Sequence, residues 1–179
     1  MREILIIGRG GQGAQTAGNQ LARAFFAEGR FVQTFATYGG ARRGTPVTAS
    51  IRADDSPIRL RCDIERADAA LCFDDTLLDA AFLRCVDADT MIVVNSTRPK
   101  DEFAALGDYR IFPIDGKDVA RANDMGKVVN SALLGAFVAV LEHPDIETMC
   151  TVIEQTAPAK QQQNVAACRQ SYQQLRDSV

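Results

Sequence analysis

Apolar runs and helical patterns alternate along the first part of the chain. Residues 4–7 form an apolar run that predicts a buried strand, and residues 31–36 predict the second strand. Between them, apolar or small side chains recur at helical spacing, at Ala14, Ala17, Gly18, Leu21 and Phe25. Gly29 follows this pattern and is a typical helix terminator. The order strand, helix, strand indicates an α/β fold.

The next segment changes to strict alternation. Residues 47–53 alternate between apolar and polar side chains, and residues 58–62 do the same. The sequence Asp54-Asp55-Ser56-Pro57 between them is typical of a turn. We therefore expect an antiparallel hairpin over residues 47–62, inserted into the α/β plan.

The second half of the chain adds more strands and helices. Apolar runs predict buried strands at residues 69–73, 91–94 and 109–114, and residues 76–86 predict a helix. Residues 128–141 are apolar on almost every side, which predicts a helix covered by the sheet on one flank and by a second surface on the other. That second surface is either the chain's own core or a partner subunit. A terminal helix has its inner stripe at Val165, Cys168, Tyr172 and Leu175.

Together these elements predict a Rossmann-like mixed sheet flanked by helices, with the inserted antiparallel hairpin, in one domain over residues 1–179. The 46% hydrophobic content is ordinary for a single globular core. The chain begins with a core strand and has no apolar run near the roughly 18 residues of a membrane span, so we expect a cytoplasmic protein without membrane contact. Five cysteines without a short repeated spacing favour reduced, buried thiols over disulfides, an iron–sulfur cluster or a zinc site.

The strongest candidate site is the turn Gly8-Arg9-Gly10-Gly11-Gln12-Gly13, which joins the first strand to the first helix. Such a turn lets a phosphate approach the backbone without a Cβ in the way, beside the positive end of the helix dipole. We expect Gly10, Gly11, Gln12 and Gly13 to provide backbone and amide donors to an anion.

The same turn fits the G-x-G-x-x-G pattern of dinucleotide-binding proteins. That pattern predicts an acidic residue about 20 residues later for the ribose hydroxyls. The second strand instead ends in Thr37-Tyr38-Gly39-Gly40. Ordinary NAD binding is therefore disfavoured.

A second candidate loop, Tyr38-Gly39-Gly40-Ala41-Arg42-Arg43-Gly44-Thr45-Pro46, follows the second strand. The first and second strands of a doubly wound sheet end on the same side, so this loop and the glycine turn are expected to face one ligand. Residues 1–53 hold seven arginines and two acidic residues, although the whole chain has a net charge of −3. Arg42 and Arg43, with Gly44 and Thr45, are candidates for binding a discrete anion or a partner chain. The net negative charge of the whole chain argues against nucleic-acid binding.

Several catalytic signatures are missing from the sequence. It has no Gly-x-Ser-x-Gly elbow, no Walker lysine and no carboxylate cluster with metal-ligand spacing. His143, the only histidine, precedes Pro144 in an expected helix connection. Asp74-Asp75 precedes an expected helix, where carboxylates cap the N-terminus and favour the dipole. We expect no catalytic residue and no metal site in this chain, so that the chemistry lies on other chains.

The sequence resembles the gamma subunit, or gamma domain, of the 2-oxoacid:acceptor oxidoreductases, which include the pyruvate:ferredoxin oxidoreductases. Residues 8–13 are similar to that family's opening G-x-G-G-Q-G, and residues 38–46 to its F-G-P-E-R-R-G-A-P loop, with Gly40-Ala41 in place of Pro-Glu. Residues 47–58 are similar to its strand pair, residues 130–136 to its N-x-x-x-L-G-A helix, and residues 160–172 to its closing helix. The resemblance covers nearly the whole chain.

The resemblance implies a subunit of a complex that oxidatively decarboxylates a 2-oxoacid to acyl-CoA and CO₂. Thiamine diphosphate, Mg²⁺ and [4Fe–4S] clusters are then expected on alpha, beta and ferredoxin-like delta subunits, and no cofactor on this chain. The chain itself is expected to support assembly and to help form the coenzyme A site through the glycine turn and the two arginines. A purely structural docking subunit and a free-standing nucleotide-binding oxidoreductase remain alternatives. The 2-oxoacid and the electron acceptor, ferredoxin or NAD, stay open.

Overall fold

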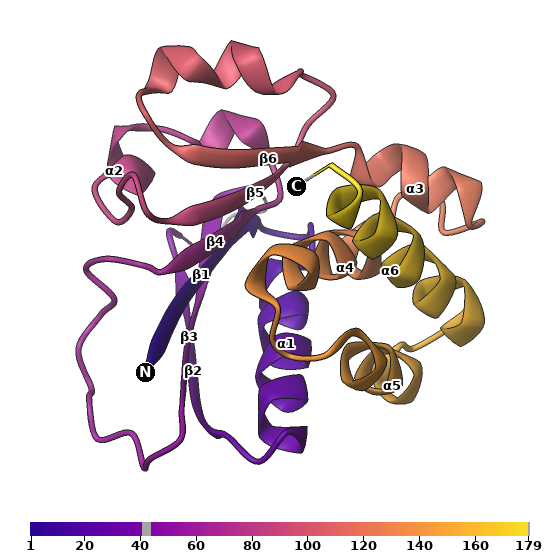
Figure 1. The fold of residues 1–179 in the computed structure, drawn as a ribbon, viewed down its shortest axis with the longest axis horizontal. Helices are drawn as coiled ribbons and strands as arrows, with labels where there is room; N and C mark the ends of the chain where they lie inside the picture. The colour runs from indigo at the N-terminus through magenta and orange to yellow at the C-terminus, as the bar shows by residue number, and fades with distance from the viewer. Residues whose placement is uncertain (41–43, 179) are drawn as a thin grey trace.

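The centre of the molecule is a six-stranded mixed sheet, in a computed structural model that describes residues 1–40 and 44–178 (Figure 1). The strands are β1 (Arg2–Arg9), β2 (Phe31–Tyr38), β3 (Pro46–Asp54), β4 (Ala69–Cys72), β5 (Met91–Asn95) and β6 (Arg110–Ile114). Their order in the sheet is β2-β3-β1-β4-β5-β6. β3 runs antiparallel to both β1 and β2, whereas β1, β4, β5 and β6 pair in parallel. The predicted α/β class with a mixed sheet is confirmed.

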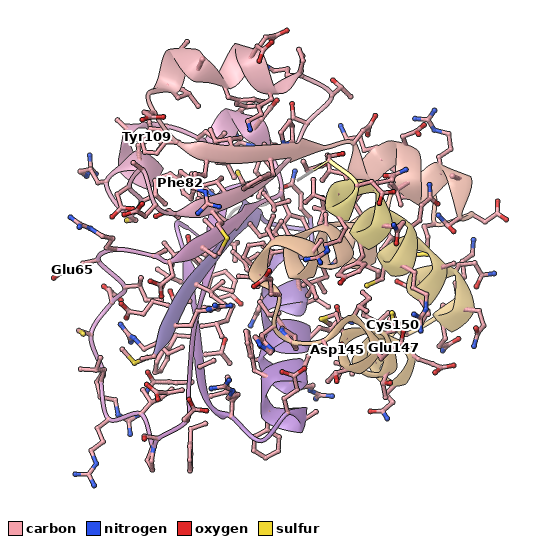
Figure 2. The ribbon with its side chains drawn as sticks, in the orientation of Figure 1. Glu65, Phe82, Tyr109, Asp145, Glu147 and Cys150 are labelled. Atoms are coloured by element: carbon pink, nitrogen blue, oxygen red, sulfur yellow. The ribbon has the colours of Figure 1, made fainter. Side chains whose placement is uncertain are left out.

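Helices cover both faces of the sheet. One face carries α1 (Ala14–Ala27), α3 (Gly116–Ala122), α4 (Asn130–Leu141), α5 (Ile146–Thr156) and α6 (Gln161–Arg176). The other face carries α2 (Ala80–Leu83) and the 3₁₀ helices η1 (Asp75–Leu77) and η2 (Lys100–Leu106). Successive side chains of the buried strands point to opposite faces of the sheet, and each face has its own hydrophobic core. Cys150 belongs to one core and Phe82 to the other, so they lie on opposite sides of the sheet (Figure 2).

The inserted hairpin exists, but β2 and β3 form it. Residues 58–62 are not a strand, so the hairpin expected over residues 47–62 is wrong. β3 pairs with β1 on one side and with β2 on the other, which leaves no edge of β3 for a further strand. Side chains hold the segment instead, since Gln33 Nε2 donates to Leu60 O at 2.9 Å and Arg52 donates to Cys62 O at 2.8 Å.

The helix expected over residues 76–86 is also wrong in its extent. η1 ends at Leu77, and α2 begins only at Ala80. Between them Asp79 has an extended backbone, and its carboxylate accepts hydrogen bonds from the N–H groups of Ala81 and Phe82. A residue in this N-cap conformation starts a new helix and interrupts the one before it.

α4 is surrounded by the chain itself. All eleven residues from Ser131 to Leu141 are buried, and α1, α5 and α6 pack around the helix together with β4 and β5. The second surface expected for this helix is therefore the chain's own core, and the partner-subunit cover is not needed. Gly135 marks the closest approach, because the backbone of α6 at Cys168 lies against it.

The remaining expectations are met unevenly. In α6 the expected inner stripe is buried at Cys168 and Leu175 and half-buried at Val165 and Tyr172. All five cysteines are free, but the expectation of buried thiols is wrong for Cys62, which is exposed, and only partly right for Cys85, which is half-buried.

His143 lies in the connection between α4 and α5, as expected. Over residues 1–40 and 44–178, no helix is both long enough and apolar enough to cross a membrane.

Candidate functional site

The glycine turn joins β1 to α1 through two residues with positive φ. Gly11 has a φ of 96° and Gly13 a φ of 94°, a region that side chains other than glycine rarely adopt. Gly13 is the N-cap of α1, and this helix has no side-chain cap and no acidic residue in its first turn. The first N–H groups of α1 therefore remain available to an anion.

The second candidate loop lies directly against the turn. The Gly10 N–H donates to Thr45 O at 2.8 Å, and the Gly44 N–H donates to Gly10 O at 3.3 Å. The sheet explains this contact, because β1 and β2 are both antiparallel to the β3 strand between them and so end on the same side. The expected convergence of the two loops is confirmed for Gly44 and Thr45. Arg42 and Arg43 lie outside the described residues.

A broad cleft of about 940 Å³ opens where the turn, the second loop and α1 meet. The Tyr38 hydroxyl donates to the side-chain oxygen of Gln15, which ties the end of β2 to the first turn of α1. The cleft is lined by Arg9, Gly10, Gly11, Gly13, Ala14, Gln15, Thr16, Tyr38, Gly40, Thr45 and Val47.

Arg9 holds the turn, the second loop and the end of β4 together. Its guanidinium donates to Asp74 Oδ2 at 3.1 Å, to Thr76 Oγ1 at 2.6 Å and to Gly44 O at 3.4 Å. Gln12 belongs to the same network, since its Oε1 accepts from the Arg9 N–H at 2.6 Å and its Nε2 donates to Asp74 Oδ2 at 3.2 Å. The shape of the turn is therefore fixed by side chains as well as by glycine.

This network narrows the set of donors that a ligand can use. The N–H groups of Gly10 and Gln12 donate to Thr45 O and Arg9 O, and both ends of the Gln12 amide are bonded to the protein. No acceptor within the described part of the chain receives the N–H of Gly11 or Gly13. Gly11 and Gly13 are thus free to donate to a ligand, whereas Gly10 and Gln12 shape the turn.

Asp74 caps η1, as the sequence predicts, and also anchors the glycine turn. Its carboxylate accepts from the Thr76 N–H at 3.1 Å in addition to Arg9 and Gln12. Burial acts to raise the pKa of Asp74, but the hydrogen bonds from Thr76, Gln12 and Arg9 outweigh it and hold the pKa below its usual value. Asp74 therefore stays ionised at neutral pH and keeps Arg9 in place.

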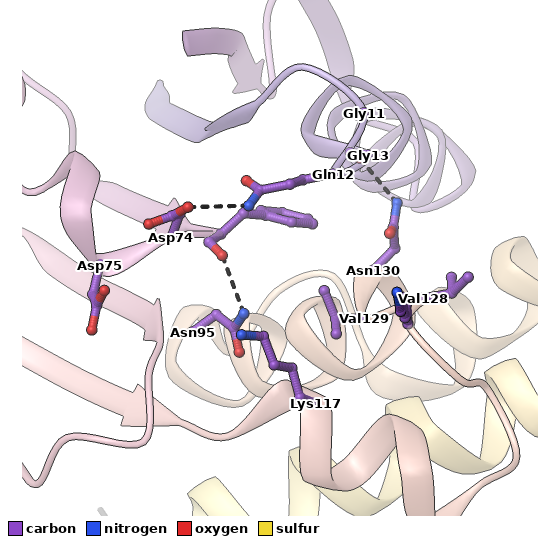
Figure 3. Close-up of a pocket in the computed structure, with 12 residues that line it drawn as sticks. Gly11, Gln12, Gly13, Asp74, Asp75, Asn95, Lys117, Val128, Val129 and Asn130 are labelled. Atoms are coloured by element: carbon purple, nitrogen blue, oxygen red, sulfur yellow. Dashed lines mark hydrogen bonds between the residues drawn. The ribbon is translucent and has the colours of Figure 1, made fainter. Parts of the chain in front are cut away.

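A second pocket, of about 430 Å³, lies on the other side of the glycine turn (Figure 3). It opens at the ends of β1, β4 and β5. The connection after β1 leaves toward one face of the sheet and the connections after β4 and β5 toward the other, a place where α/β folds commonly bind ligands. Asn130 Nδ2 donates to Gly13 O at 2.9 Å and holds the start of α4 against the turn. Lys117 and Lys127 line the pocket together with Asp74 and Asp75, so its charge is mixed.

Asn95 fixes the floor of the same pocket. Its Nδ2 donates to Phe73 O at 3.1 Å, and its Oδ1 accepts from the Gly116 N–H at 3.0 Å. One side chain thus joins the ends of β4 and β5 to the start of α3. No group of three metal-ligating side chains occurs in the residues that the structure describes.

A family model described as pyruvate ferredoxin/flavodoxin oxidoreductase matches residues 3–174 of this chain. The chain belongs to this family. Within it the chain corresponds to the gamma subunit of a 2-oxoacid:ferredoxin oxidoreductase complex, which confirms the resemblance seen in the sequence.

Two relatives illustrate the match to gamma subunits of this family. The chain is 35% identical over 177 residues to pyruvate synthase subunit PorC of Methanothermobacter thermautotrophicus, covering 98% of this chain and 96% of the relative. It is 34% identical over 178 residues to the pyruvate/ketoisovalerate oxidoreductases common subunit gamma of Pyrococcus abyssi, covering 97% of this chain and 96% of the relative.

Two solved structures show the same fold. Pyruvate oxidoreductase subunit PORC from Thermotoga maritima has a TM-score of 0.84 at 30% identity, covering 96% of this chain and 95% of that chain. A 2-oxoglutarate:ferredoxin oxidoreductase from Magnetococcus marinus, solved with 2-oxoglutarate, coenzyme A and succinyl-CoA bound, has a TM-score of 0.81 at 19% identity. That match covers 99% of this chain and 31% of the other, so the gamma fold is one part of a longer chain there.

In this gamma subunit the structure gives roles to residues that the sequence leaves without one. Asn130 opens the motif N-x-x-x-L-G-A on which the family resemblance rests, and its contact with Gly13 explains why an amide stands there. The placement of Arg9 inside the turn pattern is the signal that could have drawn attention to it. Asn95, Lys117 and Lys127 carry no comparable local signal, because only the folded sheet brings them to one pocket.

The Asp74 network makes the stability of the gamma subunit depend on pH in acid. Because the folded pKa lies below the unfolded value of about 3.8, the carboxylate stabilises the native state above that value and loses this contribution as the pH falls through the folded pKa. We expect Asp74→Asn to lower the free energy of unfolding at pH 7 by about 1–2 kcal/mol. Its free energy of unfolding should also fall less steeply than that of wild type below about pH 4.

Urea denaturation between pH 3 and pH 7 measures both effects. Asp101→Asn is the matched control, since Asp101 is exposed and bonds to no side chain among the described residues. The control should follow wild type. If the free energy of unfolding of Asp74→Asn falls with pH as steeply as that of wild type, the carboxylate does not stabilise the turn.

Proposed function

We propose that this chain is the gamma subunit of a CoA-acylating 2-oxoacid:ferredoxin oxidoreductase and forms part of its coenzyme A site. The observation that carries this proposal is the single cleft at which the glycine turn, Gly44-Thr45 and the uncapped start of α1 meet. Coenzyme A carries a diphosphate and a 3′-phosphate, and free N–H groups at a helix N-terminus favour phosphate. A phosphate of coenzyme A fits against Gly11, Gly13 and the first turn of α1.

Arg42 and Arg43 complete the proposed anion site from the second loop. The residues on either side of them support this assignment, because Gly40 lines the cleft and Gly44 is bonded to Gly10. Guanidinium groups bind phosphate through paired, charge-assisted hydrogen bonds. We propose that the two arginines bind the phosphates of coenzyme A or acidic groups of a partner chain.

The complex would convert a 2-oxoacid and coenzyme A into acyl-CoA and CO₂, and the two electrons released would pass to ferredoxin. Thiamine diphosphate, Mg²⁺ and [4Fe–4S] clusters would lie on the alpha, beta and ferredoxin-like delta subunits of a cytoplasmic complex, and this chain would be inactive alone. Pyruvate is the proposed substrate, since both relatives carry it in their names. The name of the Pyrococcus abyssi relative describes one gamma subunit common to two oxidoreductases, which supports substrate selection by other subunits.

A purely structural docking role is the second candidate. It is favoured by the internal bonding of the turn, where Gly10 and Gln12 already have protein partners. The apolar surface of α4 does not support it, because α5 and α6 cover that helix. The free-standing nucleotide-binding oxidoreductase is not retained, since the relatives are subunits of complexes.

Replacing Gln15 by glutamate separates the two remaining candidates. Gln15 lines the cleft in the first turn of α1, and glutamate keeps an acceptor oxygen for the Tyr38 hydroxyl. A carboxylate at this position favours the helix dipole but repels a bound phosphate. In the assembled complex we expect the KM for coenzyme A to rise about tenfold, or roughly 1.4 kcal/mol, with the KM for pyruvate and the Tm unchanged.

Gln163→Glu is the matched control, because Gln163 lies in the first turn of α6 and does not line the cleft. Steady-state kinetics of both variants should show a changed KM for coenzyme A only in Gln15→Glu. An unchanged KM in that variant, with the complex intact, would leave the docking role as the better account.

A further inference from the structure

The outer strand of the sheet, β2, has an unprotected edge. Its eight residues pair only with β3, and none of them is buried. Edge strands of natural proteins are usually short, or carry lysine, proline or a bulge that prevents pairing with another chain. β2 has none of these devices, since it reads Phe-Val-Gln-Thr-Phe-Ala-Thr-Tyr and pairs with β3 in unbroken register.

The opposite edge of the same sheet provides a direct contrast. β6 has five residues, contains Pro113 and has η2 packed against it. Proline and a covering element are the usual ways of blocking an edge. Of the two sheet edges in the described part of the chain, the β2 edge is therefore the longer one and the one without a blocking device.

Apolar side chains border both faces of the β2 edge. On the α1 face a groove of about 370 Å³ is lined by Ala22, Arg23, Phe26 and Val32 among others, and Phe26 is 72% exposed. On the opposite face Phe31 and Phe35 are each nearly half exposed, as is Leu60, which Gln33 holds beside the strand. Side chains of an added strand would alternate between these two apolar surfaces.

Three arginines near this edge have no partner in residues 1–40 and 44–178. Arg23 lies in the groove on the α1 face, and Arg59 and Arg61 flank Leu60 on the other. All three side chains are exposed, and none makes an ion pair or a hydrogen bond with another described residue. The edge is thus apolar with positive charge on both faces.

We propose that the β2 edge binds an extended segment of another subunit as a seventh strand, and that this segment carries acidic residues beside apolar ones. Main-chain hydrogen bonds to β2 would supply affinity, and the two apolar faces with their arginines would supply specificity. A second copy of this chain fits less well, because antiparallel pairing of two β2 strands would bring Arg59 and Arg61 of both copies to the same face. Like charges placed opposite one another destabilise such a pair.

The proposal rests on the proposed function only for the source of the segment, which is another subunit of the oxidoreductase complex. Amide hydrogen exchange of the chain, alone and in the purified complex, tests it directly. We expect β2 amides to exchange at least about tenfold more slowly in the complex, because added hydrogen bonds protect them. A complex that forms with β2 exchange unchanged would overturn the proposal, whereas failure of the chain to join any complex would overturn the proposed function.

Substitutions on the edge test the contacts. Thr34→Glu and Phe35→Glu place a carboxylate on each face of exposed β2 without changing the core, and each is expected to weaken binding to the remaining subunits about tenfold, because the carboxylate repels an acidic segment. Arg23→Glu and Arg59→Glu should each weaken it about fivefold, because an exposed ion pair becomes a repulsion.

Two variants elsewhere on the surface serve as controls. Thr151→Glu on α5 repeats the threonine-to-glutamate substitution, and Arg84→Glu repeats the charge reversal at an exposed arginine in the sheet's other half. Both should bind as wild type in surface plasmon resonance. Edge variants that bind as tightly as the controls would overturn the proposal, and so would an isolated chain that is dimeric by light scattering with β2 already protected.

Discussion

Gly13→Ala is expected to lower the free energy of unfolding by about 3 kcal/mol, from backbone strain and a steric clash together. At a φ of 94° any residue other than glycine is strained. The added Cβ would also lie well under 3.0 Å from the Asn130 side chain. Asn130 would have to give up its hydrogen bond to Gly13 O, so the start of α4 would move away from the turn.

Gly29→Ala is the control that isolates the contact with Asn130. Gly29 also has a positive φ, of 82°, but no atom lies within 4 Å of the place that its Cβ would occupy. We expect a loss of only about 1 kcal/mol there, from backbone strain alone. Equal losses for the two variants in urea denaturation would mean that Asn130 does not pack tightly on the turn.

Gly135→Ala is expected to lower the free energy of unfolding by about 3 kcal/mol or more, although alanine favours a helix over glycine by about 1 kcal/mol. The Cβ would overlap the carbonyl group of Cys168, where α4 and α6 are in closest contact. A side chain can relieve a clash by changing its rotamer, but the backbone of a packed helix cannot. The two helices must therefore separate, which opens the core around α4.

Gly116→Ala tests whether the nature of the neighbouring atom decides the loss. The Cβ there would meet the end of the Leu133 side chain at 2.9 Å and Asn95 Oδ1 at 3.0 Å, and both contacts are with side chains rather than with backbone. We expect a loss of about 1 kcal/mol or less for this variant. A Gly135→Ala protein as stable as wild type would show that α4 and α6 have room to move apart.

The sequence predicts best the elements whose structure is decided by near neighbours. β1, the glycine turn and α1 were predictable because an apolar run, glycines and a helical pattern follow one another directly. The hairpin was misplaced for the opposite reason. Residues 58–62 alternate as well as a strand does, but pairing depends on which edges remain free once β3 lies between β1 and β2.

The candidate site was predictable in its backbone and not in its supporting contacts. Gly13 stands out in the sequence, whereas Asn130, which packs on it, is 117 residues away. The contact of Asp74 with Gln12 spans 62 residues, so local pattern identified Asp74 only as a cap. Long-range contacts of this kind depend on the whole sheet, which no local pattern encodes.

The burial of α4 also has a consequence for the newly made chain. α4 leaves the ribosome before α5 and α6, the two helices that later cover it. During that interval a helix without a polar side is exposed to water, and such surfaces bind chaperones or other unfinished chains. Docking of α6 is therefore the step that completes the cover of α4.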